Sequence, residues 1–140
     1  MGDVRPFVAL GLSLRKRGHT VVIATTRDFE AFVTGHGLEF HDLGVDIQAF
    51  LRQSTFDNAM SKSMLLYAPR LLREGQRILR DASKQLWAAA QGADAIIFHQ
   101  VTNFAVDIAE ALDVPAIMTA FQPINPTGEF PYVGYDGPPP

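Results

Sequence analysis

The sequence contains no cysteine among its 140 residues, which excludes disulfide bonds and thiolate metal sites. It also lacks an excess of basic charge: the formal net charge is -3, whereas nucleic-acid-binding domains are usually strongly basic. No apolar run is long enough to span a bilayer. The N-terminus does not have the basic-then-apolar form of a secretion signal. These absences predict a cytoplasmic globular protein without a nucleic-acid partner.

The motifs that hold nucleotide phosphates are absent as well. There is no P-loop, and no G-x-G-x-x-G stretch follows a predicted strand. No two histidines have the spacing of metal ligands. We therefore expect neither a cofactor nor a metal ion, and we expect that any nucleotide is held outside this sequence.

What the sequence does contain is an alternation of helical and strand-like segments. Hydrophobic residues make up 47% and charged residues 19%, which is a globular balance. The predicted elements are helices over residues 6–17, 28–34, 70–91 and 103–112, and strands over residues 20–25, 38–43, 95–98 and 116–121. Helices and strands that alternate with short connections are typical of an α/β fold. We predict a Rossmann-like parallel sheet with helices on both faces.

Three stretches are less regular. Residues 46–58 indicate no more than a short helix and a loop. Pro69 is expected to kink or restart the helix that runs through it, because proline removes an intrahelical donor. Residues 122–140 contain six of the nine prolines, and we expect them to form an extended loop or tail.

Asp3 stands directly before the first predicted helix. Pro6 suits a first helical position, where its missing N–H would have no partner in any case. The free N–H groups and the dipole at a helix N-terminus favour a carboxylate. Taken on these residues alone, Asp3 is a capping residue.

His99 is the histidine that the pattern singles out, because it falls at the end of a predicted buried strand. Ligands of open α/β sheets bind outside the carboxyl ends of the strands. Gln100 and Asn103 follow, which places three polar side chains at one edge. Polar groups at strand ends also cap the next helix, and this structural role is favoured over a catalytic one. The remaining histidines are expected at turns or on an exposed strand: His19, His36 and His41.

The helix over residues 70–91 has two chemically different sides. One is a predicted apolar stripe of Leu71, Leu72, Ile78, Leu79, Ala82, Leu86 and Ala90. The other is a basic stripe of Arg70, Arg73, Arg77, Arg80 and Lys84. The basic stripe could contact an anionic lipid surface as a peripheral membrane site. A solvated helix face is favoured, because Glu74 and Asp81 interrupt the stripe.

Two stretches together point to a family. Residues 2–12 read GDVRPFVALGL and residues 14–25 read LRKRGHTVVIAT. This pattern resembles the N-terminal domain of family 28 glycosyltransferases, in particular sterol glucosyltransferases and the glycosyltransferases of glycopeptide antibiotic biosynthesis. The similarity extends through residues 29–40 and again through residues 124–131, so it covers nearly the whole chain.

The resemblance implies one part of a GT-B fold, in which two Rossmann-like domains face each other across a cleft. The N-terminal domain, here residues 1–140, would bind a hydrophobic acceptor such as a sterol or polyketide, and the C-terminal domain would bind the nucleotide-sugar donor. Asp3 corresponds to the aspartate proposed as general base of the inverting reaction. The acceptor site is expected at the ends of the later strands, at His99, Gln100, Asn103, Phe121 and Pro123.

The resemblance also implies that the family's first strand and the whole donor domain lie outside this sequence. We therefore expect a fragment of a UDP- or dTDP-sugar-dependent hexosyltransferase that is inactive alone. An alternative is a non-catalytic acceptor-binding subunit that docks a separately encoded donor domain. A third hypothesis is a single-domain flavodoxin-like regulator or small-ligand binder.

Overall fold

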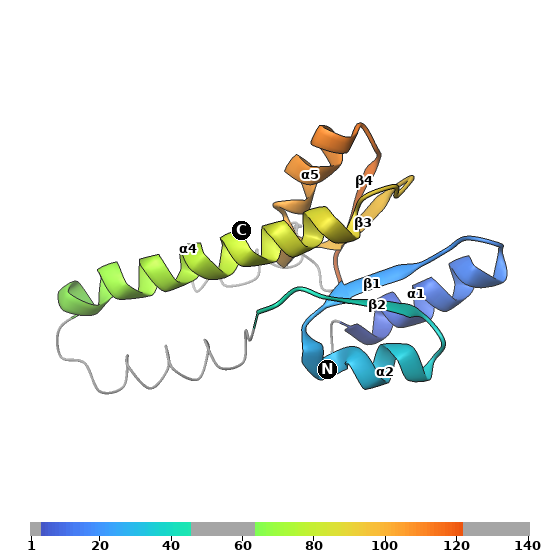
Figure 1. Ribbon diagram of the computed structural model, residues 1–140, viewed down its shortest axis with the longest axis horizontal. Helices are drawn as coiled ribbons and strands as arrows, with labels where there is room; N and C mark the ends of the chain where they lie inside the picture. Colours follow the sequence, from blue (N-terminus) through green and yellow to red (C-terminus); the bar gives the residue numbers. More distant parts are fainter. Residues whose placement is uncertain (1–3, 46–63, 122–140) are drawn as a thin grey trace, which may run out of the picture. The chain divides into compact units, whose positions relative to one another are not determined.

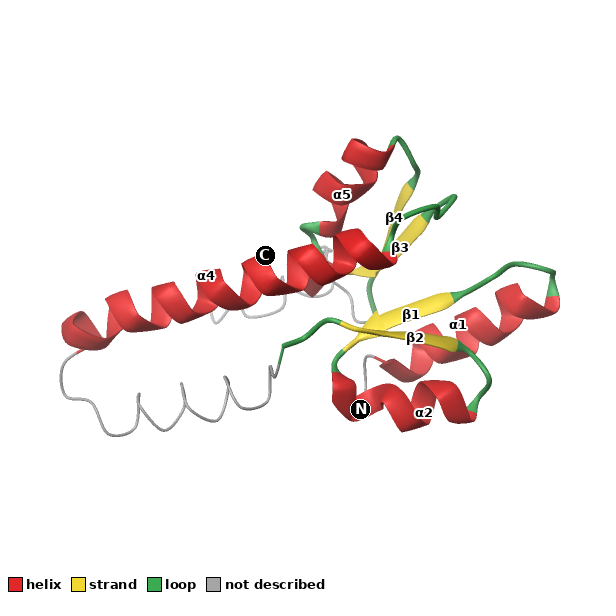
Figure 2. Ribbon diagram, viewed as in Figure 1, coloured by secondary structure: helices red, strands yellow, loops and turns green. Residues whose placement is uncertain are grey.

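The computed structural model describes residues 4–45 and 64–121 (Figure 1). The chain divides into two compact units, residues 1–92 and residues 93–140. Helices and parallel strands alternate within both units (Figure 2). The predicted α/β class is therefore confirmed. The predicted short helix at 46–58 and the tail at 122–140 lie outside the described residues.

The first unit contains a parallel strand pair with helices packed against it. Its elements are α1 (Val4–Lys16), β1 (Val22–Thr25), the 3-10 helix η1 (Arg27–Phe29), α2 (Glu30–Gly35), β2 (Glu39–Asp42) and α4 (Met64–Ala89). The register pairs Ile23 of β1 with Phe40 of β2. α1 and α2 share one core with the strands, centred on the buried side chains of Val8, Val33 and Leu38.

α1 lies close to the strands because a residue that faces them, Gly11, is a glycine. A Cβ atom built on Gly11 would lie 3.1 Å from Cδ1 of Leu38 and 3.2 Å from Cγ1 of Val21. These distances are shorter than ordinary van der Waals contacts, so a larger side chain would push α1 away from β1. The helix begins at Val4, two residues before the predicted start, and Pro6 falls in the first turn, where backbone N–H groups lack helical partners anyway.

α4 is longer than the pattern predicts. It continues from Met64 to Ala89 with Pro69 inside it, so the helix does not restart at the proline. Pro69 is the sixth residue of the helix, and at this position it removes a single intrahelical hydrogen bond near the N-terminal end. α4 contacts both β1 and β2.

The second unit repeats the arrangement on a smaller scale. Its elements are β3 (Ile96–His99), the 3-10 helix η2 (Gln100–Thr102), α5 (Ala105–Leu112) and β4 (Ala116–Thr119). β3 and β4 are parallel, and His99 pairs with Thr119 at their carboxyl ends. Asp113 follows α5 with a left-handed φ of 55°, and Pro115 comes two residues later. This is a common way to stop a helix.

The strand pairs are separate two-stranded sheets within the part of the chain that is described, so each strand has one hydrogen-bonded neighbour there. Residues 20–25 are less buried than the predicted strand covered on both faces would be: Val22 is exposed, and the rest of β1 is half-buried. Ile117 and Met118 of β4 are exposed too. β-branched runs identify strands, but they do not show how many layers cover them.

Candidate functional site

The residues predicted to bind the sugar acceptor lie in the second unit, at the edge where the carboxyl ends of β3 and β4 meet. His99 is the last residue of β3, and Phe121 follows β4 by two residues. Their rings are stacked, with centroids 5.5 Å apart and planes inclined by 18°. Phe121 is 42% exposed, so the stack offers an open aromatic surface. Such a surface at the ligand-binding edge of a parallel sheet can receive a flat apolar molecule.

One backbone hydrogen bond orients the His99 ring. Its Nδ1 accepts a hydrogen bond from the N–H of Val101 at 3.4 Å, which caps η2. A nitrogen that accepts carries no proton, so neutral His99 with this bond is protonated at Nε2. Nε2 can then donate a hydrogen bond to a bound molecule, but it cannot take a proton from that molecule. The geometry thus agrees with the capping role that the sequence favoured for His99.

Two hydroxyl groups complete this edge. Oγ1 of Thr102 donates to the carbonyl oxygen of His99 at 2.8 Å, and Oγ1 of Thr119 donates to the carbonyl oxygen of Phe98 at 3.1 Å. The second bond ties β4 to β3 beside the stacked rings. The bond from Thr102 engages the carbonyl oxygen of the last residue of β3. Neither threonine was singled out in the sequence, because threonines are common in strands and turns.

Gln100 and Asn103 lie in the turn that follows His99. Gln100 is half-buried in η2, and Asn103 is exposed, with its carbonyl oxygen accepting from the N–H of Val106 at 3.0 Å. The structure therefore brings four of the five predicted acceptor residues to one edge, with direct contact between His99 and Phe121. Pro123, and likewise the predicted base Asp3, lie outside the described residues.

The carboxyl edge of the first unit holds an ion pair. Nε of Arg27 lies 3.0 Å from Oδ2 of Asp42, and Oδ1 of Asp42 accepts from the N–H of Gly44 at 2.9 Å. Arg27 is largely exposed, so solvent screens the pair and it contributes little to stability. Oδ1 of Asp42 thus shapes the turn after β2, and Oδ2 is paired with Arg27 of η1. A carboxylate two residues before a glycine was the available signal for such a turn.

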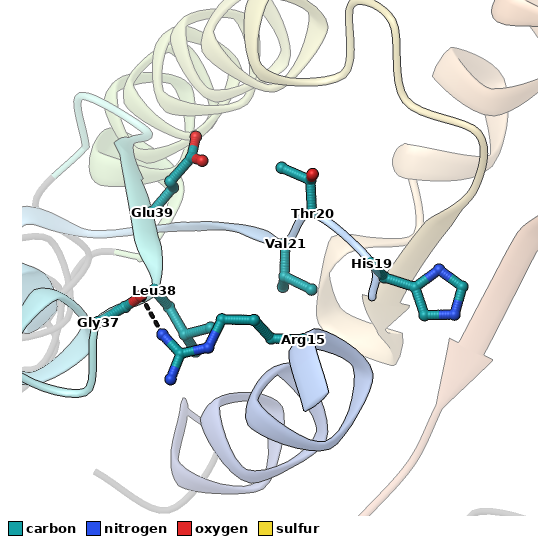
Figure 3. Close-up of a pocket in the computed structure, with 7 residues that line it drawn as sticks. All are labelled: Arg15, His19, Thr20, Val21, Gly37, Leu38 and Glu39. Atoms are coloured by element: carbon teal, nitrogen blue, oxygen red, sulfur yellow. Dashed lines mark hydrogen bonds between the residues drawn. The ribbon is translucent and has the colours of Figure 1, made fainter. Parts of the chain in front are cut away.

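A shallow hollow of about 190 Å³ lies at the opposite edge, where β1 and β2 begin (Figure 3). The guanidinium group of Arg15 crosses its floor and donates to the carbonyl oxygen of Gly37. The carboxylate of Glu39 and the ring of His19 point away from Arg15. Because these polar groups diverge, they do not form a cradle for a ligand, and the hollow lies away from the edge that binds ligands in this architecture.

The histidines of the first unit require one correction. His41 was expected on an exposed strand, but it is half-buried in β2, and its Nε2 is enclosed without a hydrogen-bond partner among the described residues. α2 and α4 both contact β2, which agrees with the partial burial of His41. His36 is exposed as predicted, and its Nδ1 lies 2.7 Å from the carbonyl oxygen of Phe32. His19 is exposed as well.

Metal-binding and membrane-spanning features were sought in residues 4–45 and 64–121. No group of three or more His, Asp or Glu side chains within these ranges is placed to hold a metal ion. Among the described helices, none is both long and apolar enough to cross a membrane.

Comparison with known proteins gives a consistent result. Residues 1–131 match the model of the glycosyltransferase family 28 N-terminal domain. A sterol 3-beta-glucosyltransferase of Debaryomyces hansenii is 35% identical over 131 residues, which cover 94% of this chain and 8% of the relative. A sterol 3-beta-glucosyltransferase of Candida albicans is 33% identical, with the same coverage. An uncharacterized glycosyltransferase of Mycobacterium leprae is 33% identical over 129 residues, which cover 91% of this chain and 31% of the relative. The chain thus spans less than a tenth of the fungal relatives.

Proposed function

This chain belongs to the glycosyltransferase family 28 N-terminal domains, and from that membership we propose that it binds the acceptor of an inverting glycosyltransferase. The reaction transfers a hexose from a nucleotide sugar to a hydroxyl group of a hydrophobic acceptor. A sterol is the first candidate, because the names of the two fungal relatives specify sterol 3-beta-glucosyltransferases. The donor binds to a domain outside this sequence, which fits the absence of a phosphate-binding motif here.

The observation that carries the acceptor role is the stacked pair of His99 and Phe121 at the carboxyl edge of β3 and β4. A sterol is flat and apolar and carries one hydroxyl group. The aromatic surface suits the ring system, and Nε2–H of His99 is the polar group beside it that can donate to an oxygen. Gln100 and Asn103 add further polar side chains in the adjoining turn. Few polar groups on an apolar surface are typical of small-molecule sites.

The chemistry needs a base in addition to a binding surface. The acceptor oxygen attacks the anomeric carbon, a C–O bond forms on the face opposite the leaving group, and the bond to the nucleotide phosphate breaks. The nucleoside diphosphate leaves with the electron pair, and the hydroxyl proton passes to a base within hydrogen-bond reach. We assign the base to Asp3, which immediately precedes α1 in the sequence. His99 is less suited, because its Nδ1 already accepts the N–H of Val101.

We expect the Phe121→Ala variant to bind a fluorescent sterol such as dehydroergosterol about tenfold more weakly than the wild-type chain. Loss of an aromatic contact with a buried ring system costs about 1.4 kcal/mol or more, which corresponds to a factor of ten. Fluorescence titration measures this affinity. Ile117→Ala is the matched control, because Ile117 is an exposed apolar residue in the middle of β4 and away from its carboxyl end.

Two results would contradict the proposal. One is equal weakening by Phe121→Ala and Ile117→Ala, which would mean that the sterol does not use the carboxyl edge. The other is saturable micromolar binding of UDP- or dTDP-glucose in calorimetric titrations of the same chain, which would assign the donor to this domain.

A further inference from the structure

The two units of the chain carry formal charges of opposite sign. Residues 93–140 contain no lysine or arginine, so with neutral histidines their formal charge is -6. Residues 1–92 contain all 12 basic residues and nine of the 15 acidic ones, which gives +3. The acidic residues of the second unit are Asp94, Asp107, Glu110, Asp113, Glu129 and Asp136. A surface with one sign of charge raises the local concentration of ligands of the opposite sign.

The carboxylates of the second unit are not neutralised within the described part of the chain. Asp94, Asp107, Glu110 and Asp113 are all exposed. The salt bridges between described residues lie in the first unit, and none of them includes these four carboxylates. Their charges therefore act on solvent and on any molecule that binds to this unit.

Asp107 is the carboxylate that belongs to the same edge as the stacked rings of His99 and Phe121. It lies in the first turn of α5, which begins at Ala105, shortly after the carboxyl end of β3. α5 contacts both β3 and β4 (Figure 1). The positive end of a helix dipole could attract an anion at such a place, but the charge of Asp107 offsets it. The ligand-binding edge of the second unit is thus negative in character.

The stacked rings supply a second feature that suits a cation. The face of an aromatic ring carries negative potential and attracts a cation that lies within about 6 Å of the ring centroid. Phe121 is 42% exposed, and its centroid lies 5.5 Å from that of His99. Nε2–H of neutral His99 can donate to an oxygen atom. An oxygen held by His99 and a cation over Phe121 would therefore be close neighbours on one bound molecule.

We infer that the acceptor bound at this edge is an apolar amino alcohol, whose hydroxyl group lies near a protonated amine. The hydroxyl oxygen accepts the hydrogen bond from Nε2 of His99, and the ammonium group lies over the ring of Phe121. Asp107 adds Coulomb attraction from the same edge. The inference rests on the proposed acceptor role of this edge and narrows the chemical class of the acceptor.

Other ligands would use only part of these features. A carboxylate or phosphate would meet no lysine or arginine of the second unit and would be repelled by its charge. A neutral sterol would use the rings and His99 but not the charge. A divalent metal ion would need several ligands, and no group of three or more His, Asp or Glu side chains in residues 4–45 and 64–121 is placed to hold one.

Three steroids that share a 3β-hydroxyl group and differ in the charge at carbon 6 test the inference. 6-Ketocholestanol is neutral, 6-aminocholestanol is cationic, and the O-carboxymethyl oxime of the ketone is anionic. Each is titrated into the 140-residue chain by calorimetry at about 0.1 M salt. We expect the amine to bind about tenfold more tightly than the ketone and the oxime about tenfold more weakly. Raising the salt to about 1 M should reduce both differences.

Three variants locate the preference, which is measured as the ratio of the affinities for amine and ketone. Phe121→Leu keeps an apolar side chain but removes the aromatic face, so the ratio should fall to about twofold. Asp107→Asn should lower the ratio about threefold. Asp94→Asn is the matched control, because Asp94 precedes β3 and lies at least one strand length, about 13 Å, from the carboxyl edge. That distance exceeds the screening length of about 10 Å, so the ratio should change less than about 1.5-fold.

The possible outcomes separate this inference from the acceptor role itself. Equal affinities for the three steroids would overturn the inference, and the acceptor role would stand if their binding still required Phe121. Equal effects of Asp94→Asn and Asp107→Asn would also overturn it, because the charge of the whole unit would then select the amine. Binding of the amine that depends on Phe121, without binding of the ketone or of dehydroergosterol, would support the inference and contradict the sterol assignment. Circular dichroism checks that each variant keeps its fold.

Discussion

Replacing Asp3 by asparagine is expected to lower kcat of the complete glycosyltransferase about 10²- to 10⁴-fold, with little change in KM for the acceptor. Asparagine has nearly the shape of aspartate and is an equally good capping residue. It cannot accept the hydroxyl proton, however, and removal of a general base typically costs this factor. The measurement is steady-state kinetics of an enzyme in which this chain is completed by the segments that its relatives carry beyond the matched residues.

The alternative role of Asp3 gives a different result in the same experiment. If Asp3 only caps α1, Asp3→Ala lowers stability by about 1 kcal/mol and Asp3→Asn leaves turnover near that of the wild type. His99→Ala is the matched control, and we expect it to raise KM for the acceptor more than it lowers kcat. If Asp3→Asn remains active while His99→Ala abolishes kcat, the base is His99 and our assignment is wrong.

Gly11→Leu is expected to destabilise the first unit by about 1–3 kcal/mol, the usual cost of overpacking a filled interior. Even a Cβ atom at this position would lie 3.1 Å from Leu38 and 3.2 Å from Val21, and both side chains face the core that α1 shares with the strands. The three further carbon atoms of leucine have no space to occupy. The change is measured as a lower midpoint of urea unfolding, followed by circular dichroism.

The same substitution at Gly75 is the control. Gly75 lies within α4, and nothing approaches within 4 Å of a Cβ atom built there. Leucine is a better helix former than glycine by about 0.5–1 kcal/mol, so Gly75→Leu should leave the midpoint unchanged or raise it. An unchanged midpoint for Gly11→Leu would mean that α1 does not pack against β1 as closely as the structure places it.

The order of the secondary-structure elements was predictable because it depends on local sequence. β-branched runs located the strands, and the glycines at positions 18, 37 and 92, all with positive φ, mark the turns after the predicted helices. The extent of α4 was not predictable in the same way. Its proline lies near the N-terminal end, where the free-energy cost of the lost hydrogen bond is low enough for the helix to continue. No local sequence rule tells whether the rest of the helix outweighs that cost.

The candidate site, too, was predictable only where it depends on residues close together in the sequence. His99 was found because a strand end is readable from the sequence, and its capping bond to Val101 spans only two residues. The salt bridge of Arg27 with Asp42 joins residues 15 positions apart, and the hydrogen bond of Arg15 to Gly37 joins residues 22 positions apart. Such pairs depend on how elements pack. The exposure of Leu72 and Leu79 was not predictable for the same reason, because the periodicity of a helix does not tell which part of an apolar stripe its neighbours cover.

The two parallel strand pairs have a consequence for how the chain folds. Each pair closes over its own short crossover, with β1, α2 and β2 contiguous in the sequence, and β3, α5 and β4 likewise. The entropy lost in closing such short loops is small, and contacts between residues near in sequence form early. During synthesis, residues 22–42 are complete before residues 96–119 leave the ribosome. The first crossover can therefore form around Val33 and Leu38 while the second half of the chain is still being made.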